Sequence, residues 1–230
     1  MRAEQMLFTQ GFGTRHECRA LVDQGRVALQ DKILFFWSEE VDPQGKWFTV
    51  DHERWPYVTK AVILLNKPVG FECSMRPTEY PSVLRLLPAP LRYRGVQPVG
   101  RLDVDTTGLL LLTDDGALNH RLTHPKHHIE KTYRVTLKHA VKEDFAERLL
   151  NGVVLKGEKT PVKAEVCTLL SDKQITMTVT SGKYHQVKRM VAAAGNRVMA
   201  LHRESMGGLK IPEKLAPGCW MWVFRFPWDL

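Results

Sequence analysis

Four consecutive leucines, Leu109 to Leu112, lie between two turns and constrain the fold of this chain more than any other feature. A short apolar run bounded by turn residues predicts a strand buried on both faces. The loop before this run carries Asp103, in the order Gly100-Arg101-Leu102-Asp103. Loops held by rigid strands often carry reactive groups, but an aspartate near Thr and Gly is also an ordinary turn residue. The pattern alone leaves both interpretations open for Asp103.

The rest of the chain alternates between short strands and short helices. The strand predictions are 26–29, 61–65, 109–112, 133–137, 162–170 and 174–180, and the helix predictions are 15–24, 116–124, 141–150 and 187–194. Thr14 and Glu17 form a capping-box pattern at the first helix, and either Thr113 or Asp114 is expected to cap the second. Hairpin-length connections indicate an α+β fold with a mixed, largely antiparallel sheet. Residues 52–60 are interpreted as a linker.

The chain has 230 residues, enough for one or two domains. No apolar window reaches the length of a membrane span, and the N-terminus lacks the apolar stretch of a secretory signal. We therefore expect a cytoplasmic protein without a membrane partner. The four cysteines are scattered, so we expect them to be reduced and mostly buried.

The net charge of +8 favours a polyanionic partner, and this charge is unevenly distributed. Residues 1–58 carry a net charge of −2 and residues 59–230 a net charge of +10. Residues 173–203 contain six Lys or Arg and no acid, while residues 120–134 carry four Lys or Arg and four His against one acid. A solvated face would explain one such stretch, but two in one domain favour binding to nucleic acid.

Several other kinds of site find little support. The glycines near the N-terminus lack the spacing of a dinucleotide-binding loop, and no phosphate-loop sequence is present. The histidines between 120 and 128 are separated by Pro125 and have no accompanying cysteine or acidic cluster, so no metal is expected there. Contacts to phosphates or bases, or simple exposure, explain these histidines better.

His185, Lys188 and Arg189 share one flank of the last predicted helix, because they are three and four residues apart. No acid in the surrounding sequence neutralises these side chains. A solvated helix surface is one interpretation. An aspartate or a phosphate from elsewhere is the other.

Four segments together resemble the pseudouridine synthases, in the RsuA-like branch that acts on the small ribosomal subunit. These segments are Leu65 to Gly70, Val99 to Gly116, His127 to Tyr133 and Ser181 to Met190. The resemblance covers nearly the whole chain. It implies that a uridine of 16S rRNA, the one at position 516, is isomerised to pseudouridine without cofactor or metal.

The resemblance also implies roles for individual residues. Asp103 would be the catalytic carboxylate, with Lys188 as its basic partner and Arg189 as the alternative, and Tyr133 would pack against the target base. Whether Asp103 attacks the substrate covalently or removes a ribose proton stays open. Arg101 would hold the backbone near the extruded nucleotide. The other expected RNA contacts are Lys67, Arg121, His127, His128, Lys131, His185, Gln186, Arg189, Arg203, Arg15, Arg19 and Arg26.

The resemblance divides the chain into an S4-like RNA-binding domain at 1–58 and a catalytic domain at 59–230. The first domain departs from the S4 pattern at Gln30-Asp31, where an Asn-Gly turn is usual, and in its net negative charge. The expected partner is ribosomal RNA or a small-subunit assembly intermediate. The protein is expected to be a monomer. Two alternatives remain: a large-subunit (23S) rRNA target for the same chemistry, or a non-catalytic assembly factor.

Overall fold

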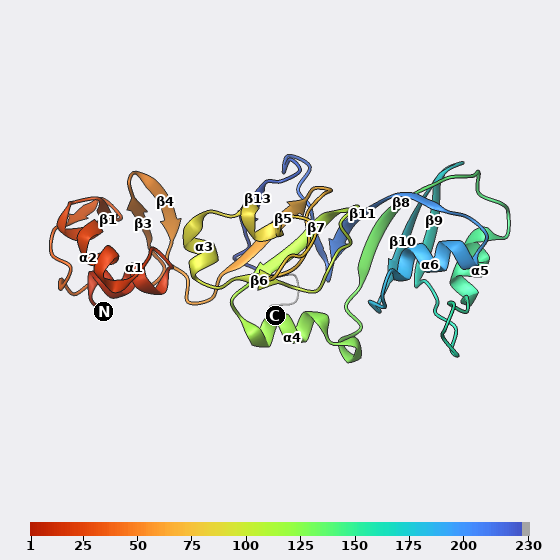
Figure 1. Cartoon of the computed structure of the whole chain (residues 1–230), viewed down its shortest axis with the longest axis horizontal. Helices are drawn as coiled ribbons and strands as arrows, with labels where there is room; N and C mark the ends of the chain where they lie inside the picture. Colours follow the sequence, from red (N-terminus) through yellow and green to blue (C-terminus); the bar gives the residue numbers. More distant parts are fainter. Residues whose placement is uncertain (227–230) are drawn as a thin grey trace. The chain divides into compact units, whose positions relative to one another are not determined.

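The computed structural model describes residues 1–226, which form two compact units (Figure 1). The first unit comprises Met1–Ala61 and Leu84–Gln97, and the second comprises Val62–Val83 and the chain from Pro98 onward. Within the described residues, no helix is both long and apolar enough to cross a membrane.

The first unit contains a four-stranded antiparallel sheet in the order β2-β1-β3-β4. Its elements are α1 (Ala3–Thr9), α2 (Arg15–Asp23), β1 (Val27–Leu29), β2 (Lys32–Leu34), β3 (Trp47–Val50), β4 (Glu53–Pro56) and α3 (Ala89–Tyr93), and a 3-10 turn spans Val83–Leu86. The capping box of Thr14 and Glu17 is confirmed at the start of α2. The linker prediction for 52–60 is wrong, because β4 pairs with β3 and Trp55 packs edge-on against Phe12.

The segment Leu84–Gln97 joins the first unit through α3, although it lies far along the sequence. Arg94 donates to the carbonyl oxygens of Val58 and Thr59, and also to the side chain of Gln10. Gly11 allows this approach, since a Cβ there would lie 2.1 Å from the carbonyl oxygen of Pro90. The first unit therefore includes a segment that the sequence analysis placed in the catalytic domain.

The second unit is built on a mixed sheet whose main path runs β13-β5-β7-β11-β8-β10-β9. The strands are β5 (Val62–Lys67), β6 (Gln97–Pro98), β7 (Thr106–Thr113), β8 (Lys131–Leu137), β9 (Val166–Ser171), β10 (Gln174–Val179), β11 (Val198–Met206), β12 (Leu209–Lys210) and β13 (Trp220–Trp222). Along this path β7 and β11 pair in parallel and the other neighbours pair antiparallel. The expectation of a mixed, largely antiparallel sheet is confirmed.

Three helices pack beside this sheet: α4 (Gly116–Thr123), α5 (Phe145–Asn151) and α6 (Gln186–Ala193), with a 3-10 turn at Pro125–His127. The cap of α4 is neither of the two residues expected, because the Asp115 carboxylate accepts from the backbone N–H groups of Ala117 and Leu118. Helix α5 begins later than predicted, since the N–H of Val141 bonds to the β9–β10 turn.

The four leucines form the centre of β7 and have no exposed surface, as the sequence predicts. Leu109 and Leu111 pack with Leu64, Leu122 and Met206 on one face. The four cysteines are free, as expected, but only Cys18 is fully buried, and Cys219 is exposed. The prediction that they are mostly buried is therefore wrong.

Gly108 sets the distance between the parallel strands β7 and β11. Its φ is +107°, and a Cβ there would lie 2.3 Å from the carbonyl oxygen of Arg203. No side chain fits this contact unless the two strands separate.

We expect Gly108→Ala to destabilise the protein by about 2–3 kcal/mol, because a methyl group would clash with the backbone of β11 and would require an unfavourable φ. Gly116→Ala, at the other end of the four-leucine strand, is the matched control, since nothing lies within 4 Å of a Cβ there. Urea denaturation of both variants checks this. Equal urea midpoints for the two variants would contradict the close contact between β7 and β11.

Candidate active site

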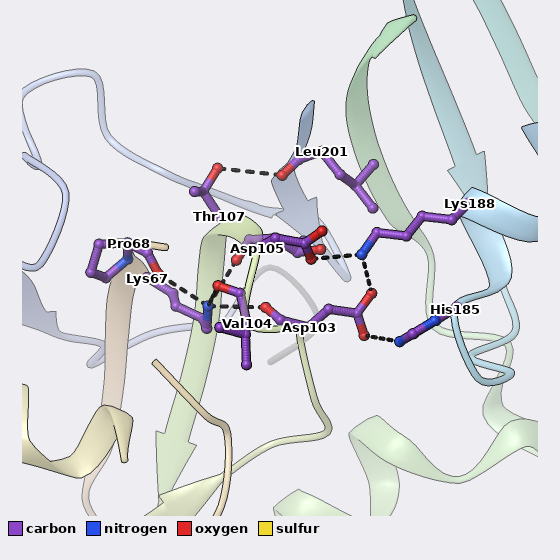
Figure 2. Close-up of polar contacts among 10 residues, drawn as sticks. Lys67, Pro68, Asp103, Val104, Asp105, Thr107, His185, Lys188 and Leu201 are labelled. Atoms are coloured by element: carbon purple, nitrogen blue, oxygen red, sulfur yellow. Dashed lines mark hydrogen bonds and ion pairs between the residues drawn. The ribbon is translucent and has the colours of Figure 1, made fainter. Parts of the chain in front are cut away.

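The Asp103 loop, Asp103–Thr106, leads into β7. A buried lysine at the end of β5 holds the backbone of this loop. The Lys67 Nζ atom donates to the carbonyl oxygens of Pro68, Asp103, Val104 and Thr106 at 2.9–3.3 Å (Figure 2). An ammonium carries three donors, so these contacts satisfy it within the chain. This lysine lies beside the loop because β5 pairs directly with β7.

Lys67 has no exposed surface, which contradicts the prediction that it contacts RNA. Burial lowers the pKa of its ammonium, although the charges of Asp105 and Asp103 act in the opposite direction. Its role is to hold the backbone of the Asp103 loop in place. The prediction fails because Lys67 is the last residue of β5, and the pairing of β5 with β7 buries its side chain against the Asp103 loop.

The Asp103 carboxylate projects from this loop toward α6. Lys188 Nζ lies 2.8 Å from Asp103 Oδ2, and His185 Nε2 lies 3.3 Å from Oδ1. Lys188 also donates to Asp105 Oδ1 at 2.6 Å (Figure 2). One ammonium therefore bridges two carboxylates, and it favours the ionised form of Asp105.

These contacts shift the pKa values of Lys188 and Asp105. Burial acts to lower the pKa of Lys188, but hydrogen bonds and charges from Asp103 and Asp105 outweigh it and raise the pKa. Burial likewise acts to raise the pKa of Asp105, and the Lys188 ammonium outweighs it and lowers the pKa. Lys188 thus stays protonated beside the carboxylates at neutral pH.

Of the two expected basic partners, the structure brings Lys188 and not Arg189 to Asp103. Arg189 donates to the carbonyl oxygens of Tyr184 and Lys156, and lies 3.7 Å from Glu158. Its guanidinium is therefore used in fixing the loop before α6. His185 caps that helix with a φ of +47°, and its ring stacks on the exposed ring of Tyr184.

A cavity of about 550 Å³ opens beside the Asp103 carboxylate. Its wall includes Arg101, Tyr133, Tyr184, His185 and Lys188, so the three residues expected to be catalytic meet here. Tyr133 comes from β8 and is 8% exposed, with its side chain in the cavity wall. A pocket of this size is typical of a site for one small molecule or one nucleotide.

Two further cations, Lys131 and Arg203, lie in the same wall. Lys131 Nζ donates to the carbonyl oxygen of Ile129 at 2.8 Å, and Arg203 Nε donates to that of Leu109 at 2.7 Å. Burial, together with the charge of Arg203, lowers the pKa of Lys131 to about 8. The wall therefore holds positive charge that is costly to bury.

The other expected RNA contacts fall into two groups. Arg101, Arg121, His127 and His128 are exposed and remain free to approach RNA. Gln186 is 5% exposed, and its amide bonds to Ser181 and to the N–H of Lys183 within its own loop. It also lines the cavity beside Asp103, so its contact with RNA stays a prediction.

The N-terminal arginines are paired with acids of their own unit. Arg19 contacts Glu4 at 2.5 Å, with Arg15 at 4.0 Å from the same carboxylate, and Arg26 contacts Asp51 at 2.5 Å. All three keep exposed surface. In the part of the chain that the structure describes, no three or more His, Cys, Asp or Glu side chains are placed to hold a metal ion.

Comparison with known proteins gives a consistent result. The sequence model of the RNA pseudouridylate synthase family matches residues 61–193. Ribosomal small subunit pseudouridine synthase A of Pasteurella multocida is 38% identical and covers 95% of this chain and 94% of its own length. The enzyme of the same name from Escherichia coli K12 is 48% identical over 67% of each chain.

A solved structure described as a pseudouridylate synthase also aligns with this chain. The TM-score is 0.68 and the identity 37%, with coverage of 97% of this chain and 96% of that one. This chain belongs to the RNA pseudouridylate synthase family. The fold expectation of a small N-terminal module followed by a pseudouridine synthase domain is confirmed.

Sequence reasoning missed two parts of the site. Asp105 was not singled out, although it shares the Lys188 ammonium with Asp103. Its place two residues after Asp103 is a signal that could have found it. The supporting role of Lys67 could not be found in this way, because it depends on the pairing of β5 with β7.

We expect Lys67→Met to destabilise the protein by about 3 kcal/mol and to loosen the Asp103 loop, because four carbonyl oxygens would lose a buried charged donor. Lys60→Met, which changes an exposed lysine shortly before β5, is the control. Urea denaturation and hydrogen exchange of the amides of 103–106 check this. Wild-type exchange at these amides in Lys67→Met would remove the supporting role.

The lowered pKa of Lys131 gives a pH dependence of stability with a defined sign. Below about pH 8 both the folded and the unfolded chain bind the Lys131 proton, so the full cost of burying the charge is present. Between about pH 8 and the ordinary lysine pKa of about 10.4, only the unfolded chain keeps this proton. Through this group, stability therefore rises with pH over that window.

We expect Lys131→Met to be more stable than the wild type at pH 7, by on the order of 1–2 kcal/mol, because the variant buries no charge. This advantage should shrink between pH 8 and pH 10. Urea denaturation at both pH values, with exposed Lys138→Met as reference, measures it. A variant less stable than the wild type at pH 7 would contradict the cost assigned to Lys131.

Proposed function

We propose that this protein isomerises a single uridine of 16S rRNA, at position 516, to pseudouridine, with Asp103 as the catalytic carboxylate. The observation that carries the proposal is the Asp103 carboxylate held 2.8 Å from Lys188 at the edge of a cavity whose wall contains Tyr133. The relatives named above, which are called small-subunit pseudouridine synthases, support the choice of rRNA.

The reaction moves the uracil ring from a bond through nitrogen to a bond through carbon. The bond between ribose C1′ and uracil N1 breaks, the base turns, and C5 bonds to C1′, after which the C5 proton leaves and N1 gains a proton. Asp103 either adds to the substrate as a nucleophile or removes a ribose proton, and both roles need an ionised carboxylate. The Lys188 ammonium lies 2.8 Å from this carboxylate and offers it a charge-assisted hydrogen bond.

The target uridine must leave its stack to reach a carboxylate inside a cavity. In the proposed arrangement the uracil ring packs on Tyr133, which is a flat side chain already fixed in β8. Arg101 is exposed at the same cavity and holds the backbone of the extruded nucleotide. Arg121, His127 and His128 supply further contacts to phosphates.

The first unit serves as the S4-like RNA-binding part of the protein. Its arginines reach RNA while they share Glu4 and Asp51, so their contribution to affinity is smaller than that of the catalytic domain. The protein acts as a monomer in the cytoplasm, on free 16S rRNA or on an assembly intermediate. A large-subunit target and a non-catalytic assembly role are the competing functions.

Pseudouridine mapping on small- and large-subunit rRNA tests the proposal, with each RNA supplied free and in partially assembled particles. We expect one new pseudouridine in 16S rRNA with the wild type and none with Asp103→Asn, while RNA affinity stays within about threefold because the substitution preserves the shape of the side chain. Asp172→Asn, in the exposed β9–β10 turn, is the control and should react like the wild type.

Each of the other outcomes rejects a different part of the proposed function. Turnover by Asp103→Asn would remove Asp103 from the catalytic role. Modification of large-subunit RNA alone would keep the chemistry and overturn the target. No modification of any substrate by the wild type would overturn the enzymatic function and support the assembly factor.

A further inference from the structure

Strands β8 and β11 place two cations on the cavity side of the sheet. Lys131 and Tyr133 are two residues apart on β8, so their side chains lie on the same face. Arg203 on β11 pairs directly with Tyr133 and lies on that face as well. All three line the cavity beside Asp103.

Arg203 carries a donor that the surrounding protein does not use. The residue is 2% exposed, and its Nε donates to the carbonyl oxygen of Leu109. Its Nη2 atom is buried and makes no hydrogen bond to any residue between 1 and 226. Burying a charged donor without an acceptor costs free energy, so an acceptor that arrives with the substrate would recover it.

Lys131 adds a second donor at the same wall. Its ammonium bonds to the carbonyl oxygen of Ile129 and keeps two further protons for other acceptors. The like charge of Arg203 and the burial of the amine both disfavour the protonated form. The fold thus keeps two mutually repelling cations next to the ring that is proposed to hold the base.

The proposed reaction places negative charge on the base. When the C1′–N1 bond breaks, its electron pair stays with the uracil ring and is shared among N1, O2 and O4. If Asp103 instead adds to the ring first, the charge also comes to rest on a carbonyl oxygen. Fixed donors aimed at such an oxygen stabilise the transition state more than the bound substrate.

We propose that Arg203 and Lys131 form a cationic wall that binds a carbonyl oxygen of the extruded uracil and stabilises the negative charge that develops on it. This inference rests on the proposed function and assigns two catalytic residues beyond Asp103. It also gives a reason for the unused donor of Arg203 and for a lysine whose protonated form burial disfavours.

A carbonyl oxygen of the base fits these cations better than a backbone phosphate does. Both cations lie within the sheet beside Tyr133; Arg203 is buried and Lys131 is half-buried. Exposed Arg101 and Arg121 are the cations suited to phosphates, since phosphates stay at the solvent side of an extruded nucleotide. The experiment below distinguishes a contact with a carbonyl oxygen of the base from a contact with a phosphate.

The test uses the full-length protein and measures single-turnover rates and RNA affinity separately. The variants are Lys131→Met and Arg203→Gln, and Lys138→Met, just after the same β8 strand and exposed, is the control. We expect a loss of rate of about 10²–10³-fold for Arg203→Gln and at least tenfold for Lys131→Met. RNA affinity should stay within about twofold for both, and the control should match the wild type.

Sulfur substitution in the RNA identifies the atom that is bound. Target RNA carrying 2-thiouridine or 4-thiouridine replaces one carbonyl oxygen with a weaker acceptor. We expect one of the two to slow the wild type and to slow Lys131→Met and Arg203→Gln much less, because the contact is already lost. Lys131→Met alone carries the test if Arg203→Gln does not fold.

Three results would overturn the inference while the proposed function stands. In the first, the wild type isomerises its target and the variants react at the same rate. In the second, the rate and the RNA affinity of the variants fall in proportion, which indicates a phosphate contact. In the third, each thiouridine slows the variants by the same factor as it slows the wild type. Wild-type protein inactive on every rRNA would instead overturn the proposed function, and this inference with it.

Discussion

The buried ammonium of Lys67 holds the backbone on which the rest of the site depends. It joins the end of β5 to four carbonyl oxygens, three of them in the Asp103–Thr106 segment. A charge in this place is satisfied only while the loop keeps its shape, so the loop is rigid before any substrate arrives. This arrangement fixes where the Asp103 carboxylate points, and the remaining groups are organised around that direction (Figure 2).

Positive charge is arranged in two places around the carboxylate. Lys188 from α6 pairs with both Asp103 and Asp105 through one ammonium. Lys131 and Arg203 from the sheet line the cavity, and within residues 1–226 their hydrogen bonds go to backbone carbonyl oxygens. The first arrangement keeps a cation in contact with the carboxylate that is proposed to react. The second costs stability, and in our proposal it is used when charge appears on the substrate, as is common where stability and activity compete.

Local sequence rules predicted about half of the helices and strands and missed others, including the long strand β11, and several of the failures have identifiable causes. The buried leucine strand, the capping box of α2 and the β9–β10 hairpin depend on neighbouring residues, so they could be read from the chain. Strand β4 was missed because its pairing with β3 stabilises a segment that looks like a linker. The segment Leu84–Gln97 joins the first unit through contacts of Arg94 with distant residues, and no local pattern records them.

The sequence by itself determined the family, the central strand and the residue types needed for the chemistry, because motifs and apolar runs are local. It predicted Asp103, Tyr133 and Lys188 as a set, and the structure brings these three to one cavity. Only the tertiary structure decided that Lys188 rather than Arg189 meets Asp103, that Lys67 is buried, and that Arg203 faces the cavity. The physical reason is that strand register and burial set the partner of each charge, and both arise from pairing between distant segments.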